Sequence, residues 1–407
     1  MEIFHLGSAC GHNQFKQIVE NSRIAPSQSA QNFESAFLSG LAKLDDVHLK
    51  ANSFYSIAPF PKGCYLKISS HTEFISEYPI SILPMINLPL VKQICMSIVV
   101  RNRLKKWINR TIQKERCVTL YGVYPASAST ILKICRKNNV KVFAFITDAP
   151  KMMYKYQKEN NPIKRIAKSY YRRKAMNIQS SFDGYIYITE AMADEVAPGK
   201  PYTVLEVICD EHIFDGIEES KSEPKAIMYA GMLHRLFGIE NIIEAFERLK
   251  SNCELWLFGD GDMVEEIKRK ADENPRIKYM GRVDRETVLK FEKQATLLVN
   301  IRNTDDEYTK YSFPSKMIEY MLSGTPMLSS RLPGIPEEYY SYIFSIETID
   351  SDIIAKKIDE LMNNEEELNK KGTEASLFAR MNKNEVIGAK KVYGFLKSVC
   401  DSTNDGK

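Results

Sequence analysis

The chain alternates short apolar runs with amphipathic runs of helical length, and this feature limits the possible folds more than any other. Such alternation is typical of parallel βαβ units, in which helices cover both faces of a sheet. The expected strands are Glu2–Gly7, Val118–Tyr121, Val142–Thr147 and Gly184–Thr189 in the first half, and Lys225–Ala230, Glu254–Phe258, Ile277–Met280, Leu297–Ile301 and Met327–Ser330 in the second.

The length and one break in the pattern indicate how many domains to expect. A chain of 407 residues exceeds the usual size of a single domain, and the periodicity lapses between Glu206 and Pro224. We therefore expect two doubly wound, Rossmann-like α/β domains facing across a cleft, residues 1–205 and 206–385, with a helix at 386–407 that packs back on the first. Doubly wound sheets bind ligands beyond the carboxyl ends of their strands, so function is expected in those loops.

Charge is divided unevenly along the chain. Residues 1–200 contain 28 Lys and Arg against 14 Asp and Glu, whereas residues 201–407 contain 28 against 38. The two halves are therefore expected to face different partners.

Neither an export signal nor a metal site is evident. The chain has no run of about 18 uncharged apolar residues, and its start, MEIFHLGSACGH, is typical of a strand rather than a signal peptide. Its eight cysteines are scattered, without a C-x-x-C pair or a Cys/His cluster. These observations predict a cytoplasmic protein with reduced core cysteines and no bound metal.

The segment from Tyr311 to Pro326 contains the most informative pattern. Pro314 suits the first turn of a helix with Ser312 as its cap, which places Lys316 and Glu319 three residues apart on one face near the helix N-terminus. Helix N-termini attract anions, because their first N–H groups are unpaired and the helix dipole is positive there.

This arrangement suits a nucleoside diphosphate. Lys316 and Arg302, which follows an expected strand, would neutralise phosphate oxygens, and Glu319 would accept hydrogen bonds from ribose hydroxyls. Gly231 and Gly238 bound a strand-to-helix turn that lets the backbone approach a phosphate. Two alternatives stay open. Lys316 and Glu319 could form only a surface ion pair, and Gly231 and Gly238 could bound only an ordinary turn.

Four segments stand in a characteristic order and spacing across most of residues 225–340. They are Gly231 to Phe246, Leu257-Phe-Gly-Asp-Gly261, Gly281-Arg-Val283 and Phe313-Pro-Ser-Lys-Met-Ile-Glu-Tyr-Met-Leu-Ser-Gly-Thr-Pro326. As a set they resemble the glycosyltransferases of the two-domain GT-B fold, and are most similar to family 4, in a subgroup with an FPSK-x-x-EY motif. Members of family 4 use nucleotide sugars and retain the anomeric configuration.

The resemblance implies a role for each domain and for individual residues. Residues 1–205 would bind the acceptor, and residues 206–385 would bind the donor. By family frequency the donor is a UDP-sugar, which is a substrate rather than a cofactor. No cofactor or metal is expected. The implied donor-binding residues are Gly231, His234, Arg235, Arg302, Ser315, Lys316 and Glu319; those on the acceptor side are Ser27, Ala30 and Gln31; the catalytic residues are Asp148, Arg235 and Lys316.

Asp148 follows an expected strand, in a segment, Thr147-Asp-Ala-Pro150, that resembles the family's loop near the reacting sugar. Relatives usually present a histidine there, and Asp148 is expected to orient the acceptor hydroxyl. Capping of the turn before Pro150 is an equally weighted alternative.

Two departures from the family pattern concern the donor contacts. Tyr311 stands eight positions before Glu319, where the family usually has a second glutamate. Met232 and Phe237 occupy positions where many relatives carry Arg and Lys.

The basic half contains two segments, Arg101–Arg110 and Lys164–Lys174, that mix cations with aromatic and apolar residues at helical spacing, downstream of the apolar segment Tyr78–Leu90. Cations and aromatic side chains suit an anionic membrane surface. We therefore expect docking on the inner face of the membrane and a glycan or polyprenyl-linked acceptor, in bacterial-type surface polysaccharide synthesis. Solvated helix faces are the alternative.

Three other functions are compatible with parts of this pattern. A nucleotide-sugar epimerase of the same fold would not need the basic aromatic helices. A catalytically silent nucleotide-binding relative would explain Met232, Phe237 and Tyr311, but not the retained pair Lys316 and Glu319. Nucleic-acid binding is not expected, because no recognisable module is present.

Overall fold

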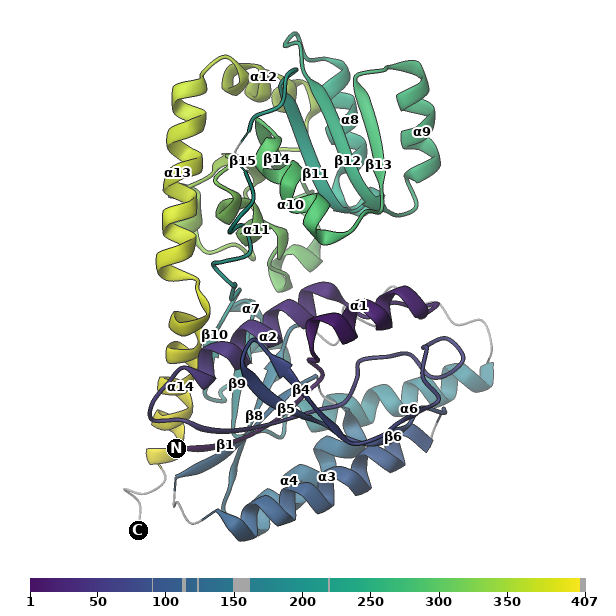
Figure 1. Ribbon diagram of the computed structural model, residues 1–407, viewed down its shortest axis with the longest axis vertical. Helices are drawn as coiled ribbons and strands as arrows, with labels where there is room; N and C mark the ends of the chain where they lie inside the picture. Colours follow the sequence, from purple (N-terminus) through teal and green to yellow (C-terminus); the bar gives the residue numbers. More distant parts are fainter. Residues whose placement is uncertain (90, 112–114, 123, 149–161, 219, 403–407) are drawn as a thin grey trace. The chain divides into compact units, whose positions relative to one another are not determined.

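The computed structural model describes residues 1–407 except 90, 112–114, 123, 149–161, 219 and 403–407 (Figure 1). The chain forms two compact units. The first consists of Met1–Ile208 and Glu385–Lys407, and the second of Cys209–Asn384.

The first unit is built on an eight-stranded sheet in the order β10-β9-β8-β7-β1-β2-β5-β4. Neighbouring strands run parallel except β4, which is antiparallel to β5. The strands are β1 (Glu2–Gly7), β2 (His48–Ser53), β4 (His71–Ile75), β5 (Tyr78–Ile82), β7 (Arg116–Tyr121), β8 (Lys141–Ile146), β9 (Gly184–Tyr187) and β10 (Tyr202–Val204), and β3 (Lys67–Ile68) pairs separately with β6 (Met85–Ile86).

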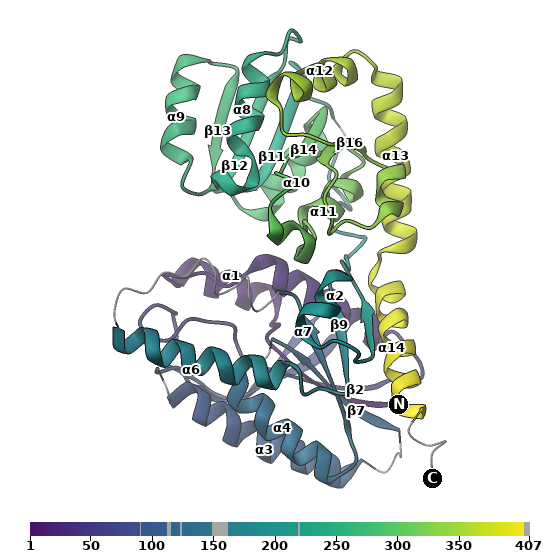
Figure 2. The ribbon, with the colours of Figure 1, turned by 180° about the vertical axis from the view of Figure 1, so that it is seen from behind.

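Helices cover both faces of this sheet. They are α1 (His12–Asn21), α2 (Gln28–Ala42), α3 (Val91–Arg110), α4 (Pro125–Lys137), α6 (Pro162–Gln179), α7 (Ala191–Val196) and α14 (Glu385–Asp401). The α3 and α4 helices lie on one face, and α2 lies on the other beside α14 (Figures 1 and 2). Gly40 permits this close approach, because a Cβ atom there would lie 2.0 Å from the Glu385 carbonyl oxygen. With both faces covered, β1 and β8 are almost continuously buried.

Two parts of the expected membrane surface belong instead to the interior. Residues Tyr78–Ile82 form β5, in which Ile80 and Ile82 are fully buried, so this stretch is not an exposed apolar segment. Trp107 of α3 is also buried, with its ring centroid 5.4 Å from that of Phe4. The apolar area of Ile80, Ile82 and Trp107 stabilises the core of the first unit, which corrects the expectation that these residues face lipid.

The second unit contains a six-stranded parallel sheet in the order β13-β12-β11-β14-β15-β16. Its strands are β11 (Ala226–Met232), β12 (Glu254–Asp260), β13 (Ile277–Gly281), β14 (Leu297–Asn300), β15 (Met327–Ser330) and β16 (Phe344–Ile346). Its helices are α8 (Ile239–Glu247), α9 (Val264–Glu273), α10 (Arg285–Gln294), α11 (Lys316–Ser323), α12 (Ser351–Met362) and α13 (Glu365–Asn382), with 3₁₀ turns at Arg235–Phe237, Glu307–Tyr311 and Glu337–Ser341.

The core of the second unit lies on both sides of its sheet. On one side, residues of α8, α9 and α12 form a continuous apolar cluster with alternate strand residues such as Ile227, Leu257 and Val299. On the other, Phe291 of α10 packs on Trp256 and Phe258 with ring centroids 5.1 and 5.0 Å apart. The prediction of doubly wound α/β architecture is confirmed.

Strand order locates the ligand-binding edge of each unit. In the second unit the order reverses between β11 and β14, and in the first between β1 and β7. Open parallel sheets bind ligands at such switch points, beyond the carboxyl ends of the strands. A ligand is therefore expected at the loops after β11 and β14 in the second unit, and after β1 and β7 in the first.

Candidate functional site

The α11 helix presents Lys316 and Glu319 in its first turn, as the spacing predicts. The expected cap at Ser312 is wrong, because the helix begins at Lys316 and its N-cap residue is Ser315. The Ser315 side chain makes no capping hydrogen bond and is exposed. It therefore leaves the first-turn N–H groups to other acceptors.

Lys316 and Glu319 belong to a charged cluster with Arg285 of α10. The Lys316 Nζ donates to Glu319 Oε1, and Arg285 Nη2 lies 3.2 Å from Glu319 Oε2. The Glu319 side chain is 10% exposed, whereas that of Lys316 is 37% exposed. The carboxylate is thus fixed between two cations, while the Lys316 side chain as a whole stays partly exposed.

Both groups are charged at neutral pH. Burial by itself would raise the pKa of Glu319, but the charges of Lys316 and Arg285 overcome it and lower the pKa to about 2. Burial would likewise lower the pKa of Lys316, but Glu319 and Glu292 raise it above its usual value. A full positive charge therefore stands at this helix end over the physiological pH range.

The turn after β11 requires glycine at Gly238. This residue has φ of 72°, and a Cβ atom there would lie 2.1 Å from the Ile301 carbonyl oxygen. Gly238 precedes α8 directly and so joins the ends of β11 and β14 at the switch point. Gly231 lies within β11, in register with Gly259 of β12.

The two basic side chains of this turn, His234 and Arg235, lie next to carboxylates of other residues in the second unit. His234 Nε2 lies 3.3 Å from Asp262 Oδ2. Arg235 pairs with Glu240 and, at 2.8 Å, with Glu266. A phosphate would have to compete with these pairs, so the donor-binding and catalytic roles of Arg235 stay predictions.

Arg302 and Lys316 both act electrostatically on one residue of β11, Tyr229. Burial raises the pKa of Tyr229 in β11, and the positive charges of Arg302 and Lys316 both act to lower it. The Arg302 guanidinium lies 4.8 Å from the Phe237 ring centroid, and its Nε donates to Asn300 Oδ1 at 3.2 Å. Both charges therefore act on a side chain of β11, which is one of the two strands at the switch point of this sheet.

The three acceptor-side residues hold local structure in the first unit. The Ser27 hydroxyl caps α2 by accepting from the Ala30 N–H at 3.3 Å. The Gln31 side chain accepts from the Cys10 N–H at 3.2 Å and donates to the Cys10 carbonyl at 2.6 Å. Gln31 thus fixes the loop after β1, and contact of these residues with an acceptor stays a prediction.

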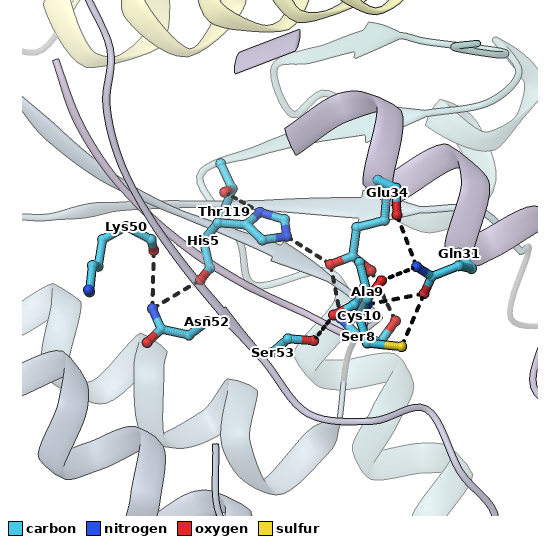
Figure 3. Close-up of polar contacts among 11 residues, drawn as sticks. His5, Ser8, Ala9, Cys10, Gln31, Glu34, Lys50, Asn52, Ser53 and Thr119 are labelled. Atoms are coloured by element: carbon cyan, nitrogen blue, oxygen red, sulfur yellow. Dashed lines mark hydrogen bonds and ion pairs between the residues drawn. The ribbon is translucent and has the colours of Figure 1, made fainter. Parts of the chain in front are cut away.

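Glu34 of α2 fixes the same loop from the next helical turn (Figure 3). Its fully buried carboxylate accepts from the Ser8 N–H at 2.9 Å, from the Ser8 hydroxyl at 3.0 Å, and pairs with His5 Nε2 at 3.0 Å. The other ring nitrogen of His5 bonds to the Thr119 hydroxyl of β7 at 2.9 Å. One buried network therefore joins β1, β7 and α2 at the switch point.

We expect Glu34→Ala to lower the free energy of unfolding of the first unit by about 3 kcal/mol, because it leaves buried donors on His5 and Ser8 without an acceptor. Urea unfolding of the full chain, followed by near-UV circular dichroism, measures the loss. Glu77→Ala, which removes an exposed carboxylate after β4, should leave stability unchanged. Equal stability of the two variants would contradict a structural role for the network.

Asp148 follows β8 at the carboxyl edge of the sheet in the first unit, and its side chain is exposed. Desolvation by the surrounding protein nevertheless raises its pKa, against a hydrogen bond from the Thr147 hydroxyl at 3.3 Å. The charges of Asp148 and Glu34 both act on Tyr121 at the end of β7. The alternative turn cap involves residues 149–150, which lie outside the described residues.

Sequence reasoning missed four members of these clusters: His5, Glu34, Arg285 and Glu292. Two of them carry a recognisable signal. Glu34 is the one acidic residue within the largely buried helix α2, and Glu292 follows the buried Leu289 by three residues on the same helix face. An isolated carboxylate on an apolar face is costly unless it is paired, so it marks a site worth examining.

Among the described residues, no three His, Cys, Asp or Glu side chains converge in a way that would hold a metal ion.

The family comparison concerns the second unit. Residues 224–364 match the family described as Glycosyl transferases group 1. A comparison with curated protein sequences found no match.

Solved structures resemble the whole chain. HepE from Anabaena in complex with UDP-glucose is 13% identical, with a TM-score of 0.62 and coverage of 98% of this chain and 100% of that one. Sucrose-phosphate synthase from Thermosynechococcus elongatus is 15% identical, with a TM-score of 0.64 and coverage of 99% and 100%. The lipopolysaccharide outer core galactosyltransferase WaaB, in its apo form, is 13% identical, with a TM-score of 0.61 and coverage of 98% and 99%.

At these identities the likeness establishes the fold, which is the GT-B fold of two Rossmann-like domains. Together with the family match over residues 224–364, it supports a GT-B glycosyltransferase.

Proposed function

We propose that the protein is a retaining glycosyltransferase that moves a sugar from a nucleotide-sugar donor, a UDP-sugar in the first instance, to a glycan or lipid-linked acceptor in bacterial-type surface polysaccharide synthesis. The observation that carries this proposal is the pair of Lys316 and Glu319 at the start of α11, with Arg302 following β14 at the switch point of the second unit. It lies within the segment that matches the family. HepE, which shares the fold, has been solved with UDP-glucose.

In this proposal the second unit stabilises the departing diphosphate. Lys316, Arg302 and the N-terminus of α11 supply positive charge to its oxygens, while Glu319 accepts hydrogen bonds from ribose hydroxyls. The acceptor oxygen bonds to the anomeric carbon on the face from which the diphosphate leaves, and a departing phosphate oxygen takes the acceptor proton. This route needs no pair of carboxylates flanking the sugar, unlike hydrolase-type double displacement.

A transfer assay separates this proposal from its two alternatives. Purified protein is incubated with a panel of UDP-, GDP-, ADP- and TDP-sugars, with and without polyprenyl-diphosphate-linked sugar or oligosaccharide acceptors. A transferase elongates an acceptor, a nucleotide-sugar epimerase changes the donor without one, and a silent relative only binds. The silent relative is favoured by the engagement of Arg235 with Glu240 and Glu266. Absence of elongation despite nucleotide-sugar binding would contradict the proposal.

Docking on an anionic membrane is a further part of the proposal, and it is supported by one face of α3. The first half of this face is apolar, with Ile94 62% and Ile98 56% exposed. Arg101 and Lys105, which are also exposed, continue the same face at helical spacing. An apolar patch followed by cations suits shallow insertion among anionic headgroups. Every helix in the part of the chain that the structure describes is too short or too polar to cross a bilayer.

We expect the protein to sediment with phosphatidylglycerol-containing vesicles but not with neutral ones at about 0.1 M salt, and to be largely released at about 1 M, where the screening length falls from about 10 to about 3 Å. The double variant Ile94→Ser, Ile98→Ser should weaken sedimentation. So should Arg172→Ala, Arg173→Ala and Lys174→Ala together, although most side chains of Lys164–Lys174 lie outside the described residues.

Ile353→Ser provides the matched control, because Ile353 is a comparably exposed isoleucine on α12 of the second unit. Nucleotide binding should be unchanged in all three variants. Wild-type protein that ignores anionic vesicles at low salt would contradict membrane docking and would indicate a water-soluble acceptor.

A further inference from the structure

Glu292 on α10 is a buried carboxyl group close to Lys316 of the proposed donor site. Its side chain is fully buried, and its Oε1 lies 3.7 Å from Lys316 Nζ. That distance is within ion-pair range but too long for a hydrogen bond. Glu292 therefore extends the cluster of Lys316, Glu319 and Arg285 to four ionisable groups on two helices.

Neither Glu292 oxygen accepts a hydrogen bond from any donor among the described residues. A buried carboxylate without hydrogen bonds costs several kcal/mol, which a neighbouring cation offsets only when the geometry is good. The neighbouring acceptor for a protonated Glu292 is the Glu319 carboxylate, because each of the two carboxyl groups shifts the pKa of the other. Two ionised carboxylates have no donor between them, so this contact itself requires a proton.

The surrounding charges indicate which carboxyl group carries the proton. Burial raises the pKa of Glu292 well above its usual value, and the negative charge of Glu319 raises it further, against the opposing charges of Lys316 and Arg285. Glu319, which touches both cations, instead has its pKa lowered to about 2. Tyr320, on which the charge of Glu292 acts, stays protonated because burial raises the pKa of its phenol. Burial and the neighbouring charges therefore favour the proton on Glu292 rather than on Glu319.

We propose that Glu292 is a positioning residue of the donor site, which as a neutral carboxylic acid donates a hydrogen bond to Glu319 and leaves the Lys316 ammonium available to a diphosphate. With Glu292 neutral, Lys316, Arg285 and Glu319 sum to one positive charge, which complements an anionic ligand. With Glu292 ionised, the sum would be zero and Lys316 would be held between two carboxylates. The ligand in this inference rests on the proposed function, whereas the protonation of Glu292 does not.

Infrared difference spectroscopy tests the protonation without any ligand. The spectrum of wild-type protein minus that of Glu292→Gln at pH 7 should contain the C=O stretching band of a carboxylic acid, shifted in D₂O. Glu286→Gln, which removes an exposed carboxylate from the same helix, should show no such band. Lack of the band in the Glu292→Gln difference spectrum would mean that Glu292 is ionised and would overturn the proposal.

Calorimetric titration with UDP-glucose, GDP-mannose and ADP-glucose tests the positioning. For the sugar nucleotide that binds most tightly, Glu292→Gln should retain wild-type affinity within about twofold, whereas the volume-matched Glu292→Met should lose about tenfold or more. Glutamine preserves a neutral donor and acceptor, and methionine preserves neither. Thermal unfolding checks that each variant is folded at the titration temperature.

Three results would overturn the positioning role. Equal losses in the Gln and Met variants would show that a negative charge is needed, and wild-type affinity in the Met variant would show that no polar group is needed. Failure of wild-type protein to bind any of the three sugar nucleotides would overturn the proposed function and the positioning role together. The infrared band would still decide the protonation of Glu292, so the two failures are distinguishable.

Discussion

Replacing either Lys316 or Glu319 by alanine will weaken nucleotide-sugar binding by roughly tenfold or more, about 1.4 kcal/mol. Lys316→Ala removes the partly exposed cation at the N-terminus of α11. Glu319→Ala removes the expected ribose acceptor, and it also releases Lys316 and Arg285 from the carboxylate that orients them. Isothermal titration of the full chain with UDP-glucose and UDP measures both losses, and a circular dichroism spectrum checks the fold.

The matched control is the neighbouring ion pair of Glu286 and Lys290, which are four residues apart on α10 with their charged atoms 2.8 Å apart. Alanine at either position removes a helical salt bridge that is exposed, so nucleotide affinity should be unchanged. If the α11 variants bind as tightly as these controls, the pair on α11 is a structural ion pair and the donor site lies elsewhere.

Asp148→Asn will lower turnover by about 100-fold while nucleotide affinity stays within about twofold, because a group that serves only the reacting centre acts on the transition state. Asparagine retains the size of the side chain but cannot carry the charge that would orient an acceptor hydroxyl. Steady-state transfer rates and separate donor titrations give the two quantities. Asp194→Asn, an exposed aspartate on α7 of the same unit, should change neither.

The pH profile provides a second readout for Asp148. Desolvation raises the pKa of Asp148 above its usual value of 3.8, so the ionised form is lost as pH falls through that raised value. Wild-type turnover should therefore decline on the acid side at a pH above 3.8, and the Asn variant should lack this decline. A parallel loss of thermal stability and activity in Asp148→Asn would instead identify a turn cap.

Regular elements with strong local patterns were predictable from the sequence. The predicted strands Glu2–Gly7 and Met327–Ser330 coincide with β1 and β15, because strands buried on both faces appear as continuous apolar runs. The strand His48–Ser53 was missed, since only its second half is buried and it alternates polar and apolar residues over only six positions. Residues Tyr78–Ile82 were missed as a strand because Pro79 interrupts them, and proline is tolerated there in the strand that pairs with the edge strand β4.

In the candidate site, too, some features follow from local sequence spacing and others only from tertiary packing. The sequence by itself determined that Lys316 and Glu319 share a helix face and that Gly238 bounds a turn, because both depend on spacing of a few residues. Only the tertiary structure decided that Arg285 and Glu292, from a different helix, complete the charged cluster, and that Glu34 holds the loop after β1. These contacts join elements separated by many residues, and their geometry follows from strand order and helix packing, which local periodicity does not encode. The local surroundings then set the charge of each glutamate. Glu319, which lies beside two cations, is ionised, whereas Glu292, which accepts no hydrogen bond from any donor among the described residues, is protonated.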